Sequence, residues 1–436
     1  MAKIDAAVAK ARALDMLEFI NAAWTPYHAV EESAKRLAAA GFQHIAEKDA
    51  WDLQPGGKYY FTRNMSTIVA FAVGKKYSPG NPFYMIGAHT DSPCLKVKPV
   101  SKATGGGCQL INVETYGGGL WYTWFDRDLG VAGRALVREG DRLVHRLIKV
   151  TKPVLRIPML AIHLQRNMYQ EGFKPNFQTN LMPLLATSGK AAAAAAAAAP
   201  VTPSAVAGAS AAAASPDGAA AAGDPATNGA AGADGSVAAK HHALFMQLVA
   251  DELGCSPNDV VDFELNVCDV QPGVLGGAAE EFVFVGRLDN LASCYTAIEA
   301  LCDSVRGDDS LDDEVAVRSL ACFDHEEVGS DSAQGAGGPV MRDTITRVAR
   351  ALSQGQEGAV ERALRQSFLV SADMAHALHP TYTDKHDALN APAFHGGLVL
   401  KHNSNQRYAT NAISAALFRG LGSGVEVGAF SVGSTG

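Results

Sequence analysis

Residues 82–93 read PFYMIGAHTDSP, an apolar run that ends at His89, with Asp91 two positions later. The run over 82–88 predicts a buried strand, so His89 and Asp91 fall where that strand hands over to a loop. At this spacing Asp91 can accept the second N–H of the imidazole and fix the tautomer of His89 for metal binding. A structural histidine and aspartate at a strand end would give the same pattern.

Three further segments place acidic side chains after an apolar run, or between such a run and a helix. They are GRLDN around Asp289, FDHEEVGS around Glu326 and Glu327, and SADMAH around Asp373. Open α/β sheets hold their ligands at the ends of strands, so the joint placement of these segments predicts a two-metal hydrolase site.

Each acidic position also fits a simpler role. Asp289 suits either the cap of the following helix or a carboxylate that bridges two metal ions. An adjacent glutamate pair is commonly a solvated surface, but here an apolar strand precedes it and small residues follow it, which favours a packed loop. In such a loop one glutamate can ligate a metal while the other acts as general base. Buried strands rarely end in an unpartnered carboxylate, which favours a ligand role for Asp373.

Length and composition limit the class of protein. A chain of 436 residues exceeds the usual size of one core, so two domains are expected. The net charge of −8 gives no electrostatic reason for a nucleic acid or an anionic membrane as partner. The seven cysteines include no CxxC pair, and no apolar run is long enough to span a membrane, which predicts a cytoplasmic protein. The basic start of the chain leaves organelle targeting open.

The order of the predicted elements indicates an α/β fold. Strands alternate with helices at both ends of the chain, whereas short alternating segments with glycine turns from 93 to about 165 predict a β-rich part, barrel- or sandwich-like. We therefore expect a mixed sheet with helices on both faces, interrupted by a β-rich domain. The predicted boundaries are 1–95, 96–240 and 241–436.

Residues 188–240 form the clearest break in composition. Of the fifty positions 191–240, 26 are alanine, and most of the others are Gly, Pro, Ser, Thr and Asp. The alanine run favours helix locally, but the scatter that follows leaves no apolar face to bury. We interpret this segment as a disordered surface insertion of the β-rich domain.

Six segments together resemble successive signature segments of the aspartyl aminopeptidase family of zinc metallopeptidases. The resemblance runs in order from about residue 10 to about residue 418, interrupted by the alanine-rich insert. The segments are GAHTDSPCLKVKP, VETYGGGLWYTWFDRDL, LRIPMLAIHLQR, GRLDNLASCYTAIEAL, FDHEEVGSDSAQGA and SADMAHALHPTYTDKH. The resemblance implies an enzyme with two zinc ions per subunit that removes Asp and Glu from peptide N-termini.

The same resemblance implies a role for each motif residue. His89, Asp289 and Asp373 would hold one zinc, and Asp289 would bridge to a second zinc held by Glu327. Glu326 would be the general base, and Asp91 would orient His89. His and carboxylate ligands suit manganese or cobalt as well as zinc.

Four further residues match positions near the substrate in this family. His376, Lys401 and Tyr408 would line the substrate pocket, where a buried cation favours acidic over apolar side chains. His163 would reach the site of a neighbouring subunit, because the family assembles as dimers within a tetrahedral dodecamer. The β-rich domain would then be the dimerisation domain.

The family pattern continues past AISAALFR to a final histidine that completes the second zinc, whereas the last histidine here is His402. The resemblance therefore implies a C-terminally incomplete chain with a weakened second site and greatly reduced activity. Alternatives are a weakly active or inactive homologue that acts as an oligomerisation subunit, and a two-metal hydrolase of another specificity.

Overall fold

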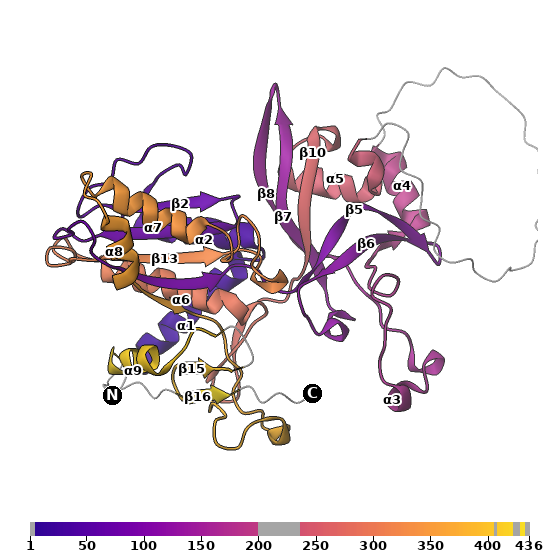
Figure 1. The fold of residues 1–436 in the computed structure, drawn as a ribbon. Coiled ribbons are helices and arrows are strands. Elements are labelled where there is room, and N and C mark those ends of the chain that lie inside the picture. Colours follow the sequence, from indigo (N-terminus) through magenta and orange to yellow (C-terminus); the bar gives the residue numbers. More distant parts are fainter. Residues whose placement is uncertain (1–4, 199–235, 405–407, 422–427, 432–436) are drawn as a thin grey trace, which may run out of the picture. The chain divides into compact units, whose positions relative to one another are not determined.

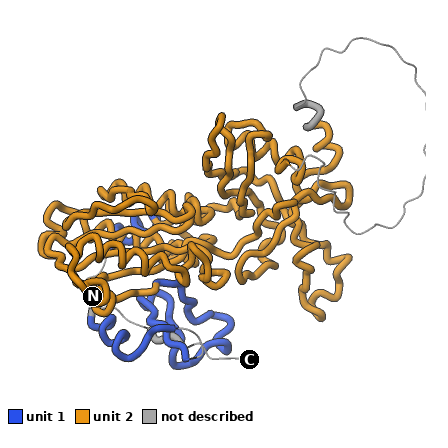
Figure 2. Tube along the Cα trace, turned by 45° about the horizontal axis from the view of Figure 1, so that its top comes forward, with its two compact units in different colours: residues 1–15, 372–436 blue, residues 16–371 orange. Residues whose placement is uncertain are grey.

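The computed structural model describes residues 5–198, 236–404, 408–421 and 428–431. The chain divides into two compact units, coloured separately in Figure 2. The larger unit is Met16–Ser371, and the smaller unit combines Met1–Asp15 with Ala372–Gly436.

A six-stranded mixed sheet in the larger unit carries the first predicted motifs. Its strand order is β1-β2-β3-β13-β4-β14. In the centre, β13 runs antiparallel to β3 and parallel to β4, and β14 is parallel to β4 on the other side. The strands are β1 (Gln43–His44), β2 (Lys58–Arg63), β3 (Thr67–Val73), β4 (Phe83–His89), β13 (Val317–Phe323) and β14 (Phe368–Ser371).

Helices cover both faces of this sheet (Figure 1), because its central strands are apolar on both sides. All seven residues of β3 are buried, and alternate residues point to opposite faces. Ile68, Ala70 and Ala72 pack with α1, α2 and α6, whereas Phe71 and Val73 pack with α7 and α8. The helices are α1 (Ala6–Ala22), α2 (Pro26–Ala39), α6 (Leu288–Ser304), α7 (Val340–Ala351) and α8 (Ala359–Gln366).

The segment between β4 and β13 forms a second sheet, in the order β8-β7-β10-β5-β6-β9. All its pairings are antiparallel, and the buried side of helix α5 packs against its core. The elements are β5 (Cys94–Gly105), β6 (Cys108–Tyr116), β7 (Leu129–Glu139), β8 (Arg142–Leu155), β9 (Leu184–Thr187), α5 (Ala243–Leu253) and β10 (Val260–Asp269). The predicted α/β fold, with helices on both faces of a mixed sheet and a β-rich interruption, is confirmed.

The β-rich part was expected to be barrel- or sandwich-like. Arg156, directly after β8, forms an antiparallel bridge with Leu184 of β9, so the two outer strands of this sheet meet as in a barrel. Phe245, Met246 and Val249 of α5 pack on its apolar core. The predicted boundaries at residues 95 and 240 stay predictions. Both α5 and β10 nevertheless come from beyond residue 240 and pack in this second sheet.

The alanine-rich insert begins with a helix, α4 (Ser188–Ala198), so the prediction of disorder is wrong for residues 188–198. Alanine has the highest helix propensity, and Ala191 is buried at the start of the run. A 3-10 turn, η3 (Ala238–Lys240), closes the insert. Residues 199–235 lie outside the described residues.

The remaining elements are short. The smaller unit contains α9 (Ala412–Leu421), η6 (Thr383–Lys385) and the parallel pair β15 (Val399–His402) and β16 (Gly428–Ser431). The larger unit adds β11 (Val274–Gly276), β12 (Phe282–Phe284), α3 (Met168–Glu171), η1 (Trp121–Trp124), η2 (Ile162–Leu164), η4 (Pro257–Asp259) and η5 (Glu326–Val328). Over the described residues, no helix has the length and apolar character needed to cross a membrane.

Helix α2 begins beside a buried imidazole whose protonation opposes folding. Thr25 is the N-cap, and its hydroxyl lies 2.8 Å from Nδ1 of His28. Burial, and then the nearby Lys149 and Lys35, lower the pKa of His28 to about 4. In the unfolded chain the pKa of the His28 imidazole is about 6.5. As the pH falls, His28 is therefore protonated in the unfolded chain before it is protonated in the folded one.

We predict that the stability contributed by neutral His28 is complete above about pH 6.5 and is lost as the pH falls toward about 4. Between about pH 7.5 and about pH 5 this residue should account for a loss of about 2 kcal/mol in the free energy of unfolding. Urea unfolding at both pH values measures this loss, which should shrink in His28→Gln. An equal pH dependence in wild type and variant would contradict the assignment.

Candidate metal centre

His89 is the last residue of β4 and is anchored in the core. Its backbone is paired with Phe323 at the end of β13, and its side chain is only 6% exposed. The thiol of Cys294, on α6, donates to the His89 carbonyl at 3.0 Å. The imidazole is thereby fixed at the edge where β4 and β13 end together.

Asp91 is buried beneath this edge of the sheet and links neighbouring segments through hydrogen bonds. The residue is 1% exposed, and its carboxylate accepts the backbone N–H groups of Glu326 at 3.2 Å and Glu327 at 3.1 Å. It also accepts the hydroxyl of Tyr116 at 2.7 Å, and Oδ1 lies 3.4 Å from Nδ1 of His89. Burial would raise the pKa of Asp91, but its hydrogen bonds with His89 and Tyr116 hold it below the usual value.

The imidazole Nδ1 faces two oxygens of Asp91, since it lies 3.0 Å from the backbone carbonyl as well. A proton on Nδ1 satisfies this contact and leaves Nε2 as the metal-binding atom. This arrangement supports the predicted orienting role of Asp91.

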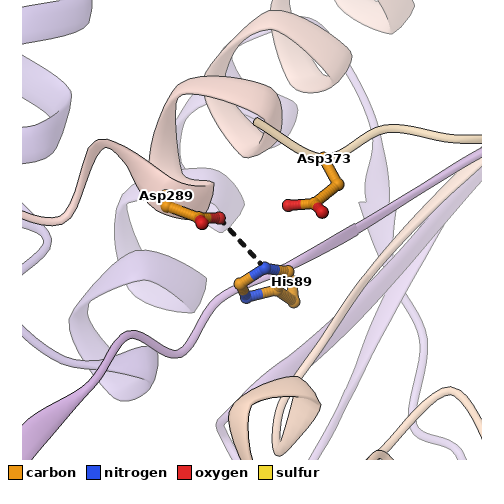
Figure 3. A group of neighbouring side chains, drawn as sticks. All are labelled: His89, Asp289 and Asp373. Atoms are coloured by element: carbon orange, nitrogen blue, oxygen red, sulfur yellow. Dashed lines mark ion pairs between the residues drawn. The ribbon is translucent and has the colours of Figure 1, made fainter. Parts of the chain in front are cut away.

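Asp289 approaches the other nitrogen of the ring. Its Oδ1 lies 3.3 Å from Nε2 of His89, and the dashed line in Figure 3 marks this contact. The residue stands at the start of α6, after Arg287 in the left-handed region, and its carbonyl accepts the hydroxyl of Ser92 at 2.7 Å. The side chain of Asp289 is 56% exposed, so a bound ion could reach it.

Glu326 and Glu327 complete the cluster within the larger unit. They form the 3-10 turn η5 just past β13, where His325 adopts a left-handed conformation. Oε2 of Glu326 lies 3.8 Å from Nε2 of His89. One ligand atom from each of His89, Glu326 and Glu327 can be chosen so that all three lie within 4.8 Å of one another.

Burial and neighbouring carboxylates together change the protonation of Glu327. Burial raises the pKa of Glu327 to about 7, and the neighbouring carboxylates of Asp91, Glu326 and Asp289 add to the rise, against a lowering by His89. An imidazole nitrogen surrounded by carboxylate oxygens is a donor set that zinc accepts. The residues therefore fit a divalent metal ion.

The smaller unit holds the predicted residues of the last motifs. Nζ of Lys401, on β15, lies 2.8 Å from Oδ2 of Asp373 and 2.6 Å from the carbonyl of Met374. His376 is exposed, and its ring centroid lies 5.8 Å from that of His386. Tyr408 is 40% exposed. The predicted substrate contacts of these residues, and the ligand role of Asp373, stay predictions.

His163 belongs to η2, in the extended segment between β8 and β9, and is exposed. Its predicted reach into a neighbouring subunit stays a prediction.

Sequence reasoning missed two residues that shape the centre, Tyr116 and Gly117. Tyr116 donates to Asp91, and Gly117 follows with a φ of +75°. A Cβ on Gly117 would lie 2.9 Å from Cβ of Glu327, so only glycine fits between the strand and this glutamate. The signal for both was the Tyr-Gly-Gly-Gly run at 116–119, at the end of a predicted strand.

An imidazole and several carboxylates gathered where parallel strands end define a metal-dependent hydrolase. Residues 19–432 match the family model described as aminopeptidase I zinc metalloprotease (M18), and the chain belongs to this family. It is a metalloaminopeptidase of the aspartyl aminopeptidase type. The predicted family is confirmed.

Two relatives illustrate the similarity in sequence. A probable aspartyl aminopeptidase of Ricinus communis is 49% identical over 415 residues, which cover 94% of this chain and 81% of the relative. An aspartyl aminopeptidase of Aspergillus oryzae is 47% identical over 418 residues, covering 94% and 80%.

Two solved structures illustrate the similarity in fold. A cryo-EM structure of the Ape4 and Nbr1 complex contains a chain with 38% identity and a TM-score of 0.86, and the match covers 100% of this chain and 77% of that one. A structure of the S. cerevisiae mApe1 dodecamer gives 26% identity and a TM-score of 0.77, with 97% and 86% covered.

We predict that Asp91→Asn weakens the metal centre, because an amide cannot accept both backbone N–H groups and also face the His89 ring. Loss of such a supporting partner lowers metal affinity or activity by about 10- to 100-fold. Zinc titration and turnover measure the effect, and circular dichroism checks that the variant folds. Tyr116→Phe, which removes one donor and leaves the carboxylate, should lose less.

Wild-type zinc affinity and turnover in folded Asp91→Asn would show that the carboxylate does not support the centre.

Proposed function

We propose that this chain is a zinc-dependent aminopeptidase that releases N-terminal Asp and Glu from peptides, with Glu326 as general base. The observation that carries the proposal is the approach of Asp289 and Glu326 to the same nitrogen of His89, at 3.3 and 3.8 Å. The family membership supports the metal and the class of reaction.

His89 and Asp289 would hold a first zinc with Asp373, as the sequence motif implies. Asp289 and Glu327 would hold a second zinc. When bound, zinc polarises the scissile carbonyl and lowers the pKa of a water molecule. Burial, and then the like charges nearby, raise the pKa of Glu327 to about 7, and a bound cation would lower it.

Glu326 suits proton transfer through its position. Its side chain is 50% exposed and therefore reachable by water and peptide, while its backbone N–H is held by Asp91. The carboxylate would accept a proton from the attacking water and deliver it to the departing amine. The neighbouring Glu327 lies against Gly117 and is less exposed than Glu326. This difference supports a metal-binding role for Glu327 and a general-base role for Glu326.

We predict that Glu326→Gln lowers the turnover of an N-terminal aspartyl peptide by at least about 100-fold, the scale of a general base, while zinc content stays unchanged. A turnover assay and a metal analysis of the same sample measure the turnover and the zinc content. Glu361→Gln, on an exposed position of α8, is the matched control and should retain turnover. Loss of zinc together with turnover would reassign Glu326 to metal binding.

We propose that Lys401 provides selectivity for acidic substrates. Its side chain is 19% exposed, and its ammonium already contacts the carboxylate of Asp373. A partly buried ammonium attracts a substrate carboxylate and gives nothing to an apolar residue. The ion pair offers a competing role, in which Lys401 only positions Asp373.

The two roles predict different kinetics for Lys401→Met. If Lys401 contacts the substrate, kcat/KM for a glutamyl substrate should fall by about 10-fold or more, while that for a leucyl substrate should change little. If Lys401 only positions Asp373, both substrates should lose activity in proportion. Lys385→Met, an exposed lysine paired with Asp384 in the same unit, is the control.

We also propose a homo-oligomer. The dodecamer formed by one of the similar proteins supports this assembly. So do the exposed apolar side chains that flank His163 on the segment between β8 and β9, namely Met159, Leu160, Ile162, Leu164 and Tyr169. Exposed apolar groups of this kind mark protein interfaces.

A further inference from the structure

Two cysteines face each other across adjacent strands of the second sheet. Cys94 is the first residue of β5, and Cys268 is the last but one of β10. The antiparallel register pairs Leu95 with Val267 and Lys96 with Asn266, so the next position outward places Cys94 opposite Cys268. All seven cysteines of the chain are free thiols.

This placement satisfies the distance requirement of a disulfide. Residues directly opposite in an antiparallel pair have Cα atoms about 4.5 to 5.5 Å apart, with their side chains on the same face. Disulfides span Cα separations of about 4.4 to 6.8 Å. The two thiols can therefore be joined without moving the strands apart.

A cavity would be the route by which a small molecule reaches the two sulfurs. Cys94 and Cys268 are only 7% and 3% exposed, but both line a cavity of about 500 Å³ within the larger unit. Trp24, Thr25, Asn266 and Arg287 form other parts of its wall. Cys294 and Cys322 are also buried and lie close enough for a hydrogen bond, but they do not line this cavity.

Cys94 and Cys268 also lie where the chain enters and leaves the second sheet. The chain leaves the first sheet at His89 and enters the second at Cys94, and it leaves the second sheet at Asp269 before it reaches Asp289. A bond between Cys94 and Cys268 would tie together the two segments that lead to these metal-centre residues.

We propose that Cys94 and Cys268 are a modification site, which forms a disulfide on reaction with a low-molecular-weight disulfide such as oxidised glutathione. One cysteine thiolate attacks a glutathione sulfur, the S–S bond breaks, and the first glutathione leaves and takes up a proton. The second cysteine thiolate then attacks the mixed disulfide and releases the second glutathione. Two protein thiols are oxidised, and one glutathione disulfide is reduced to two thiols.

The rate of this reaction should depend on pH. Burial raises the pKa of the Cys268 thiol to about 11 and also raises that of Cys94. Thiolate is the attacking form, so the exchange should be slow near neutral pH and become faster as the pH rises toward these values.

Peptide mapping of the full-length protein tests the proposal. Reduced protein is treated with oxidised glutathione at about pH 8.5, alkylated and digested without reduction. We expect a linked peptide pair containing Cys94 and Cys268, loss of two of the seven free thiols, and full reversal by dithiothreitol. Cys94→Ser and Cys268→Ser should each abolish the linked pair, and Cys302→Ser should keep it.

Two results would overturn the proposal. One is glutathione bound only to the less buried Cys108 and Cys255, with the Cys94 and Cys268 peptides alkylated and unlinked. The other is a link between Cys294 and Cys322 in place of the proposed one. The map of the wild-type protein decides the question alone if a serine variant does not fold.

Discussion

The hydrogen bonds of the buried Asp91 carboxylate are the interaction on which the metal centre depends. They join three chain segments that are far apart in sequence: the end of β4, the end of β6 and the turn that follows β13. A carboxylate with 1% exposure is stable only when its oxygens are fully paired, and here backbone N–H groups and a tyrosine hydroxyl supply that pairing. The backbone of Glu326 and Glu327 is thereby fixed beside His89.

The sheet register explains why these groups meet. β4 and β13 are parallel neighbours, and the pairing of His89 with Phe323 brings both strand ends to the same level. The glutamates follow three and four residues after Phe323, and Asp91 follows two residues after His89. The core beneath is apolar on both faces of the sheet, and the acidic groups of the centre follow the strand ends. Open α/β sheets hold their ligands at such an edge, which supports the proposed site.

Apolar runs in the sequence were sufficient to predict the strand that ends at His89 and the strands that precede Glu326 and Asp373. They were also sufficient to predict the helices on either side. Motif resemblance supplied the family. The contacts of Tyr116 and Gly117 could not be predicted, because they depend on a non-local approach of the second sheet to η5. The packing of α5 on the second sheet could not be predicted, because α5 lies after the insert in sequence. The alanine run favoured helix locally, but its composition led to a prediction of disorder for the whole insert, and α4 forms at its start. The Lys401–Asp373 ion pair is likewise a contact that spacing along the chain does not reveal.

Anomalous diffraction at the zinc absorption edge, on crystals of the zinc-loaded protein, tests whether Asp91 supports the metal centre from behind. We expect an anomalous peak about 2.0 to 2.1 Å from Nε2 of His89, with Nδ1 still facing Asp91 and the Asp91 carboxylate still accepting from Glu326 and Glu327. A peak bound to Nδ1, or coordinated by the carboxylate of Asp91 itself, would contradict the claim that Asp91 supports the centre from behind.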